Sequence, residues 1–224
     1  MYVLRAENVS YDYKTPAGIT HALKDVTADF EKGKIYSVTG RSGSGKTTLL
    51  SLLAAFDVPL SGKILYEGAE ISEKELSKYR RENIGIVFQS YNLIPHLTAL
   101  ENVMLALDIS KKNIGDKKKA AIDALESVGL DKSLYKKFPL TLSGGEQQRV
   151  AIARAVVAEP NVILADEPTG NLDNENSENI IFLLKKIAHE KNKCVIVVTH
   201  SREIADETDI EYVMSDGKIK NIRV

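Results

Sequence analysis

"GRSGSGKTT", residues Gly40 to Thr48, is the stretch from which the fold can be worked out. It fits the pattern G-x-x-x-x-G-K-[ST], it follows the β-branched run "KIYSVT", and it precedes the apolar run "TLLSLLAAF". A strand, a glycine-rich turn and a helix are therefore predicted in that order, as in an α/β protein. A structural turn alone would explain the glycines, but it would leave Lys46 and the two threonines after it unexplained.

The chemistry predicted for this loop is phosphate binding. Its glycines allow backbone N–H groups to approach the oxygens of the β- and γ-phosphates closely. Lys46 supplies a positive charge, the Thr47 hydroxyl can ligate Mg²⁺, and Thr48 adds a further phosphate contact. The predicted nucleoside triphosphate site thus contains the consecutive residues Gly40, Arg41, Ser42, Gly43, Ser44, Gly45, Lys46, Thr47 and Thr48.

The composition limits the class of protein. With 224 residues, of which 43% are hydrophobic, the chain can bury the core of one domain. Thirty basic and 31 acidic residues leave a net charge of -1, so we expect no nucleic-acid partner. The single cysteine, Cys194, lies in the apolar run "CVIVV" and is interpreted as a buried thiol. No uncharged run approaches the roughly 18 residues of a membrane span, and we expect a cytoplasmic chain without direct membrane insertion.

Short apolar runs predict the rest of the fold. "KIYSVTG", "NIGIVFQ", "NVILADEP" and "KCVIVVTH" are typical of buried strands in a largely parallel sheet. "YVLRAENVSYDY" and "HALKDVTADFEKGK" alternate in polarity and indicate an antiparallel layer. Between these regions, "DKKKAAIDALESVGL" has helical periodicity and a stop at Gly129.

The predicted fold class is therefore α/β, a P-loop NTPase core with a mostly parallel sheet flanked by helices. To this core we add an N-terminal antiparallel β-layer and a helical subdomain. We expect one domain over residues 1–224, with the core and β-layer at 1–89 and 150–224 and the helical subdomain at 90–149.

Polar residues stand where the predicted parallel strands end, which is where open α/β sheets bind ligands. Asp166 is predicted to hold Mg²⁺. Glu167, expected on the opposite pleat, would orient or deprotonate an attacking water. These two acidic residues could instead simply end a strand in solvent. Gln89 is predicted to reach Mg²⁺ or the water, and His200 to donate to the γ-phosphate, although each residue alone is more often structural.

A second anion-binding segment is predicted at "LTLSGGEQQRV", Leu140 to Val150. Ser143 and Glu146 have the spacing of a capping box at a helix start. Gly144 and Gly145 then occupy the first helical turn, where each glycine costs up to ~1 kcal/mol relative to alanine. A helix N-terminus without β-carbons allows close approach of an anion, so we expect this segment to act both as a cap and as an anion site.

Taken together, these motifs resemble the ATP-binding subunit of an ABC transporter over essentially the whole chain. In this resemblance 40–48 is the Walker A loop, and Leu142 to Arg149 is the signature "LSGGQ" with Glu146 at its fifth position. The remaining motifs that it identifies are Gln89 as the Q-loop, "VILADEP" as Walker B, Asp173 in "GNLD" as the D-loop and His200 as the switch histidine. Tyr13 fits the residue that stacks on adenine, and Tyr11 is a close competitor because spacing does not separate them.

The resemblance implies an enzyme that hydrolyses ATP with Mg²⁺ and forms a head-to-tail homodimer. Each ATP would lie between the Walker A loop of one subunit and residues Ser143, Gly144, Gly145, Glu146 and Asp173 of the other. A separate integral membrane permease is implied as a partner, with the cassette peripheral on the inner face of the cell membrane.

The stretches "FQSYNLIPHLTALENV" and "ADEPTGNLD" further resemble the subfamily of macrolide exporters, lipoprotein-releasing ATPases and bacitracin-resistance transporters. This implies efflux of a peptide, an antibiotic or a lipophilic compound, or mechanical work across the envelope. Two alternatives remain open: a cell-division-type ABC ATPase that regulates a membrane protein without transport, and a soluble ABC ATPase that does not serve transport.

Overall fold

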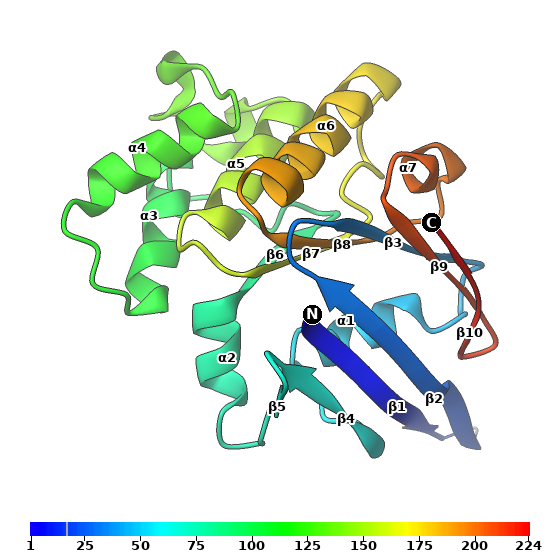
Figure 1. Ribbon diagram of the computed structural model, residues 1–224. Helices are drawn as coiled ribbons and strands as arrows, with labels where there is room; N and C mark the ends of the chain where they lie inside the picture. Colours follow the sequence, from blue (N-terminus) through cyan, green and yellow to red (C-terminus); the bar gives the residue numbers. More distant parts are fainter. Residues whose placement is uncertain (17) are drawn as a thin grey trace.

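The strands predicted around the phosphate loop form the centre of the molecule (Figure 1). The computed structural model describes residues 1–16 and 18–224, apart from the side chain of Thr15. Its central sheet has six strands in the order β10-β9-β3-β8-β7-β6. These strands are β3 (Ile35–Gly40), β6 (Ile84–Phe88), β7 (Val162–Asp166), β8 (Cys194–Val198), β9 (Ile210–Ser215) and β10 (Lys218–Arg223). All neighbouring pairs are parallel except β10 with β9, which confirms the predicted sheet.

The central sheet separates two hydrophobic cores because side chains alternate between the faces of a strand. In β7, Val162 and Leu164 contribute to the core shared with the β-layer. Ile163 and Ala165 contribute to the core shared with the helical side. A strand buried on both faces needs apolar residues at every position, which explains why its sequence is a continuous apolar run.

An antiparallel layer covers one side of the central sheet, as predicted. It has the order β2-β1-β4-β5. Its strands are β1 (Tyr2–Thr15), β2 (Gly18–Glu31), β4 (Ser61–Tyr66) and β5 (Ala69–Glu70). Phe30 of this layer meets Tyr36 and Tyr212 of the central sheet, with ring centroids 5.1 Å and 5.4 Å away. Such edge-on aromatic pairs contribute about 0.5–1.5 kcal/mol each beyond their buried area, so this cluster holds the two sheets together.

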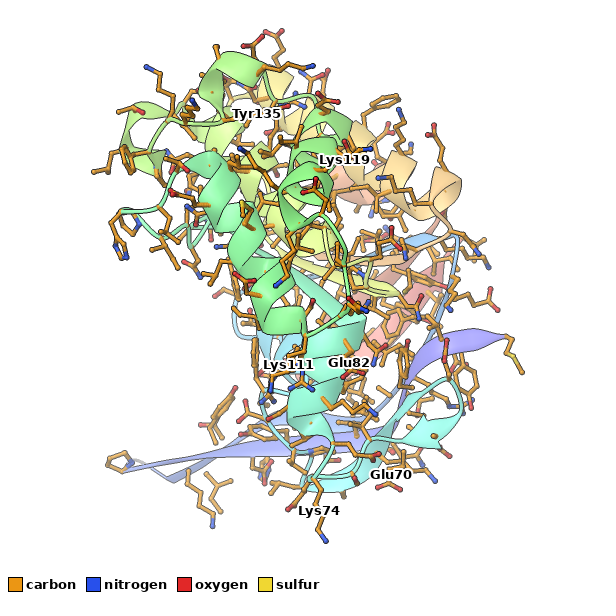
Figure 2. The ribbon with its side chains drawn as sticks, turned by 90° about the vertical axis from the view of Figure 1, so that its left-hand side faces the viewer. Glu70, Lys74, Glu82, Lys111, Lys119 and Tyr135 are labelled. Carbon is orange, nitrogen blue, oxygen red and sulfur yellow. The ribbon has the colours of Figure 1, made fainter. Side chains whose placement is uncertain are left out.

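The helices complete the fold. They are α1 (Lys46–Leu53), α2 (Leu76–Asn83), α3 (Ala99–Ser110), α4 (Lys117–Ser127), α5 (Gly144–Val156), α6 (Asn174–Glu190) and α7 (Arg202–Asp206). The predicted helix before Gly129 is confirmed as α4, and Gly129 lies just beyond it with a φ of 72°. Figure 2 shows this helical side, with Lys119 and Tyr135 far from Glu70 and Lys74 on the side of the β-layer.

Helix α5 continues without interruption across the predicted division between residues 149 and 150. The division into a core and a helical subdomain therefore stays a prediction. Within residues 1–16 and 18–224, no helix is long and apolar enough to cross a membrane.

Candidate active site

The phosphate loop joins β3 to α1, and its glycines are required for different reasons. Gly40 and Gly45 have φ values of 149° and 104° and lie close to other backbone segments. A β-carbon at Gly40 would lie 2.3 Å from the carbonyl oxygen of Met214, and one at Gly45 would lie 2.6 Å from that of Ala22. Gly43, with a φ of 77°, has no atom within 4 Å of its β-carbon position. The loop is thus packed at both ends and open in the middle, which fits a phosphate group.

Two polar side chains of the loop also fit an anion. Lys46 is buried, and its Nζ donates to the carbonyl oxygens of Gly40 at 2.9 Å and Arg41 at 3.1 Å. Because an ammonium group has three N–H donors, one remains for a ligand. The Ser44 Oγ is buried and has no hydrogen-bond partner in the described part of the chain. A buried hydroxyl without a partner is costly, so a phosphate oxygen is a fitting acceptor for it.

Tyr13 lies beside this loop. Its hydroxyl oxygen is 3.2 Å from the Oγ1 of Thr48, and 42% of the residue is exposed. Tyr11 is half-buried and packs edge-on against Tyr13, with ring centroids 5.1 Å apart. The exposed ring at the loop therefore belongs to Tyr13, which supports it over Tyr11 as the residue for adenine stacking.

Asp166 and Glu167 follow the central strand β7. Burial and the negative charge of Glu167 raise the pKa of Asp166, while the ammonium of Lys46 acts in the opposite direction. The expectation that Glu167 lies on the opposite pleat of the strand is wrong. β7 ends at Asp166, and Glu167 has a φ of 45°, while its N–H donates to the Val198 carbonyl at 2.9 Å. A left-handed turn, not the pleat, directs this carboxylate.

His200 follows β8, the neighbour of β7, and meets Glu167. Its Nδ1 is 2.8 Å from the Oε1 of Glu167, and the two side chains are 74% and 17% exposed. Both residues line a cavity of about 770 Å³ that continues along α6 and α7 past Phe182 and Ile204. The carboxylate is thus held by a histidine at the edge of a solvent-accessible cavity.

Gln89 follows β6, on the other side of β7. Its carbonyl oxygen accepts a hydrogen bond from the Asn171 Nδ2 at 3.0 Å. Its side chain lies against Gly170, where a β-carbon would come within 2.7 Å of the Gln89 Nε2. The register pairs Phe88 with Asp166 and Asp166 with Val198, so the structure places Gln89, Glu167 and His200 after the ends of three adjacent strands.

The signature segment begins α5 in the predicted way. The Ser143 N–H donates to the Glu146 Oε2 at 2.7 Å, and the Glu146 N–H donates to the Ser143 Oγ at 3.4 Å. A β-carbon at Gly144 would lie 2.9 Å from the Tyr91 hydroxyl oxygen, and one at Gly145 would lie 2.7 Å from the Asn176 Oδ1. The two glycines thus have a packing role within the chain, which the sequence interpretation missed.

Asp173 lies near this segment in the structure, because it caps the helix that contains Asn176. Its Oδ1 accepts a hydrogen bond from the Asn176 N–H at 2.8 Å, and hydrogen bonds from Asn176 lower the pKa of Asp173. Among the described residues, no hydrogen bond or ion pair connects 143–146 with the loop 40–48.

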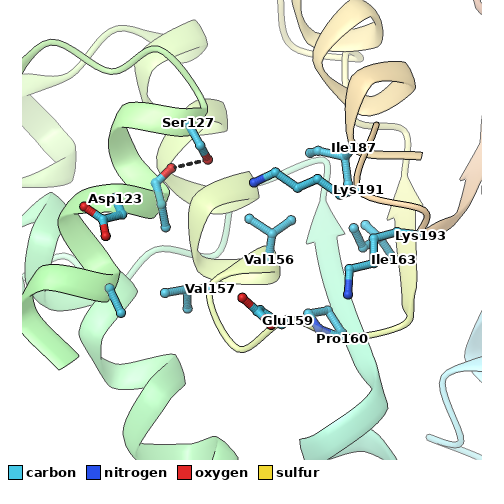
Figure 3. Close-up of a pocket in the computed structure, with 12 residues that line it drawn as sticks. Asp123, Ser127, Val156, Val157, Glu159, Pro160, Ile163, Ile187, Lys191 and Lys193 are labelled. Atoms are coloured by element: carbon cyan, nitrogen blue, oxygen red, sulfur yellow. Dashed lines mark hydrogen bonds between the residues drawn. The ribbon is translucent and has the colours of Figure 1, made fainter. Parts of the chain in front are cut away.

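Figure 3 shows a separate cavity of about 440 Å³, and none of the active-site residues described above lines it. It is lined by Asp123 and Ser127 of α4, by Val156 of α5 and by Lys193, which precedes β8. Two of its lining residues, Pro160 and Lys193, precede the amino ends of β7 and β8, whereas the phosphate loop follows the carboxyl end of β3. This cavity therefore lies toward the amino ends of the parallel strands, away from the phosphate loop.

Comparisons with known proteins identify the family of this chain. A model of the ABC transporter family matches residues 23–170. The ATP-binding protein LolD of the lipoprotein-releasing system from Aquifex aeolicus is 44% identical over 220 residues, covering 97% of this chain and 96% of LolD. The uncharacterized ABC transporter ATP-binding protein YclH of Bacillus subtilis is 43% identical, covering 97% and 95%.

The structure also resembles the cassette MJ0796 of Methanocaldococcus jannaschii, which has been solved as a dimer and as a dimeric post-hydrolysis state with ADP and Pi. The TM-score is 0.90 for both structures at 39% sequence identity, with 98% of this chain and 97% of that chain covered. The chain therefore belongs to the ABC transporter family, as one of its ATP-binding cassettes.

Proposed function

We propose that this ATPase hydrolyses ATP at the phosphate loop with Glu167 as the general base. The observation that carries the proposal is the convergence of Gln89, Glu167 and His200 after three adjacent strand ends, beside Asp166 and Lys46. Each of these groups suits one part of phosphoryl transfer to water, which depends mainly on positioning and charge.

The loop residues hold the substrate in this proposal. The Lys46 ammonium and the backbone N–H groups of 40–48 bind the β- and γ-phosphates, and Tyr13 stacks on the adenine. Thr47, Gln89 and Asp166 would hold Mg²⁺, which neutralises phosphate charge when it is bound. Thr47 is exposed and Asp166 half-buried, so both can reach a ligand at the loop.

Glu167 and His200 act on the other side of the γ-phosphate. Glu167 accepts a proton from the attacking water, and its contact with His200 keeps the carboxylate in place. Nδ1 of His200 contacts Glu167, and Nε2 is the ring nitrogen that faces the γ-phosphate in this proposal; both nitrogens donate only when the ring is an imidazolium.

The site is completed by a second copy of the chain. Ser143, Gly144, Gly145 and Glu146 would contact the γ-phosphate of ATP bound to the partner, with Asp173 beside them. The α5 N-terminus supplies N–H donors and partial positive charge for this contact. The dimeric form of MJ0796 supports the arrangement.

The cassette would act on a membrane permease from the inner face of the cell membrane. The lipoprotein-releasing system to which LolD belongs supports a role in the cell envelope. The proposed work is efflux of a peptide, an antibiotic or a lipophilic compound, or mechanical work across the envelope.

The test is the oligomeric state and turnover of Glu167→Gln. This variant keeps the size of the side chain but removes the base, so it should bind ATP, remain dimeric and lose about 10²–10⁴-fold in turnover. Adding Ser143→Arg, which fills the anion site, should abolish the dimer while the monomer still binds ATP. Light scattering with and without ATP measures the oligomeric state, and phosphate release measures turnover. Wild-type turnover by Glu167→Gln would refute the assignment of the base.

A further inference from the structure

The loop that carries Gln89 has an unusual backbone. Two consecutive residues after it, Tyr91 and Asn92, have φ values of 59° and 49°. Residues with a β-carbon adopt this left-handed conformation singly and seldom in succession, and it persists only where surrounding contacts hold it. The contacts of Tyr91 and Asn92 therefore help to hold the loop that carries Gln89.

One side chain holds both left-handed residues. The guanidinium of Arg154, in α5, donates through NH2 to the Tyr91 carbonyl oxygen at 2.8 Å and through NH1 to the Asn92 carbonyl oxygen. Both of these hydrogen bonds go to backbone carbonyl groups and neither to a carboxylate, and burial lowers the pKa of Arg154. A half-buried cation that is satisfied by two successive carbonyl groups suits the planar fork of arginine.

Two further contacts extend this arrangement to the rest of the site. The Asn171 side chain donates to the Gln89 carbonyl, and the Tyr91 hydroxyl lies against Gly144. Gly144 and Arg154 belong to the same helix. The loop after Gln89 is thus attached to α5 near its signature end by Tyr91 and further along by Arg154.

We propose that Arg154 is a positioning residue for ATP hydrolysis, because it fixes the loop that carries Gln89 to the helix that begins with the signature segment. The inference rests on the proposed function. Arg154 touches neither nucleotide nor metal, and it acts through the backbone of residues 91 and 92. A displacement of Gln89 would therefore require a movement of α5, and a movement of α5 would displace Gln89.

The experiment compares Arg154→Met with Arg154→Lys and with a matched control, Lys112→Met. Met keeps an unbranched apolar stem but is shorter than Arg and removes every donor, whereas Lys keeps the charge and can reach one carbonyl. Lys112 also donates to two successive carbonyl groups, those of Ala158 and Glu159, but not in the loop after Gln89. The control thus removes the same kind of interaction elsewhere in the fold.

Arg154→Met should lower kcat about tenfold or more, since a small misplacement of a catalytic group is costly. It should also raise the Mg²⁺ concentration for half-maximal activity, because Gln89 is a proposed metal ligand. Binding of a fluorescent ATP analogue to the monomer should not change, Arg154→Lys should recover part of kcat, and Lys112→Met should behave as wild type. Circular dichroism identifies variants that do not fold. If Arg154→Met does not fold, the same measurements are made on Arg154→Lys.

A double-mutant cycle separates positioning from general damage to the fold. If Arg154 acts through Gln89, Arg154→Met should cause no further loss of kcat in a Gln89→Ala background. If the losses of kcat from the two substitutions multiply in the double variant, the inference is overturned while the proposed function stays intact. A wild-type Mg²⁺ dependence in Arg154→Met would have the same consequence. A wild-type protein without ATPase activity would instead contradict the proposed function itself.

Discussion

The Nδ1 atom of His200 lies 2.8 Å from the Oε1 atom of Glu167, and this contact joins the segments that follow β8 and β7. The carboxylate is only 17% exposed, whereas the imidazole is 74% exposed. The histidine thus contacts the half-buried carboxylate while its own outer edge stays accessible. The contact suits the proposed roles of Glu167 as the base and His200 as the group that orients it.

Removal of the imidazole should therefore impair chemistry more than binding. We expect His200→Ala to lower kcat about 10²–10⁴-fold, the range for one acid–base group, while ATP still binds. The matched control is His189→Ala, because the His189 Nε2 makes a similar contact of 2.9 Å to the Asp209 Oδ2. Steady-state ATPase assays should show a wild-type kcat for the control, and an equal loss in both variants would contradict the role of His200.

The signature serine should have two separable roles. Ser143 and Thr98 both form complete capping boxes, at the starts of α5 and α3. Replacing either residue by Ala should cost about 1 kcal/mol of unfolding free energy, as measured by urea denaturation. Ser143→Ala should also lower ATPase activity of the dimer, whereas Thr98→Ala should retain it. Equal activity in the two variants would limit Ser143 to capping.

The ionised Asp166 side chain should lower the free energy of unfolding at neutral pH. Its pKa in the folded protein is raised from 3.8 by burial and by Glu167, so the folded state binds its proton more tightly than the unfolded state. The stability contributed by this group is then complete below about pH 3.8 and is lost as the pH rises through the folded pKa. At pH 7 without nucleotide, Asp166→Asn should raise Tm, by about 2–4 °C for each kcal/mol regained.

Thermal unfolding at two pH values checks this prediction. The difference in Tm between Asp166→Asn and wild type should shrink as the pH falls through the raised folded pKa of Asp166, because the wild-type carboxyl then becomes protonated. Asp123→Asn, a change at an exposed carboxylate of α4, is the control and should leave Tm close to wild type. A lower Tm for Asp166→Asn at pH 7 would contradict the electrostatic argument.

Glu211 should stabilise the fold at neutral pH. Burial would raise the pKa of Glu211, but hydrogen bonds from Thr39 and Arg202 and the charges of Arg202 and Arg223 lower it overall. This stability is present above the unfolded pKa of about 4.5 and is lost as the pH falls through the folded pKa. Glu211→Gln should cost about 2 kcal/mol, less than a fully buried ion pair because both arginines are half exposed.

Denaturant unfolding at pH 7 measures this cost. Glu190→Gln is the matched control, because Glu190 pairs with Lys186 on the surface of α6 and its side chain is 64% exposed. Its loss should stay below about 1 kcal/mol. Equal losses in the two variants would show that burial of Glu211 adds nothing to its ion pairs.

The parallel sheet was predictable because its strands are buried on both faces and are therefore continuous apolar runs. The capping box of α5 was predictable because it depends on a local spacing of three residues. Arg154 was missed for the opposite reason: its partners, Tyr91 and Asn92, are backbone carbonyls 63 and 62 residues away in the chain. Backbone acceptors leave no mark in a sequence pattern.

The sequence by itself determined which groups can carry the chemistry: a lysine and glycines in one loop, an Asp-Glu pair, and single Gln and His residues after apolar runs. Only the tertiary structure decided how Glu167 is directed, that His200 holds it, and that Gly144 and Gly145 face Tyr91 and Asn176. The physical reason is the distance along the chain between the residues that interact. Caps, turns and periodic burial depend on near neighbours, whereas a contact between two loops depends on the strand order that brings them together.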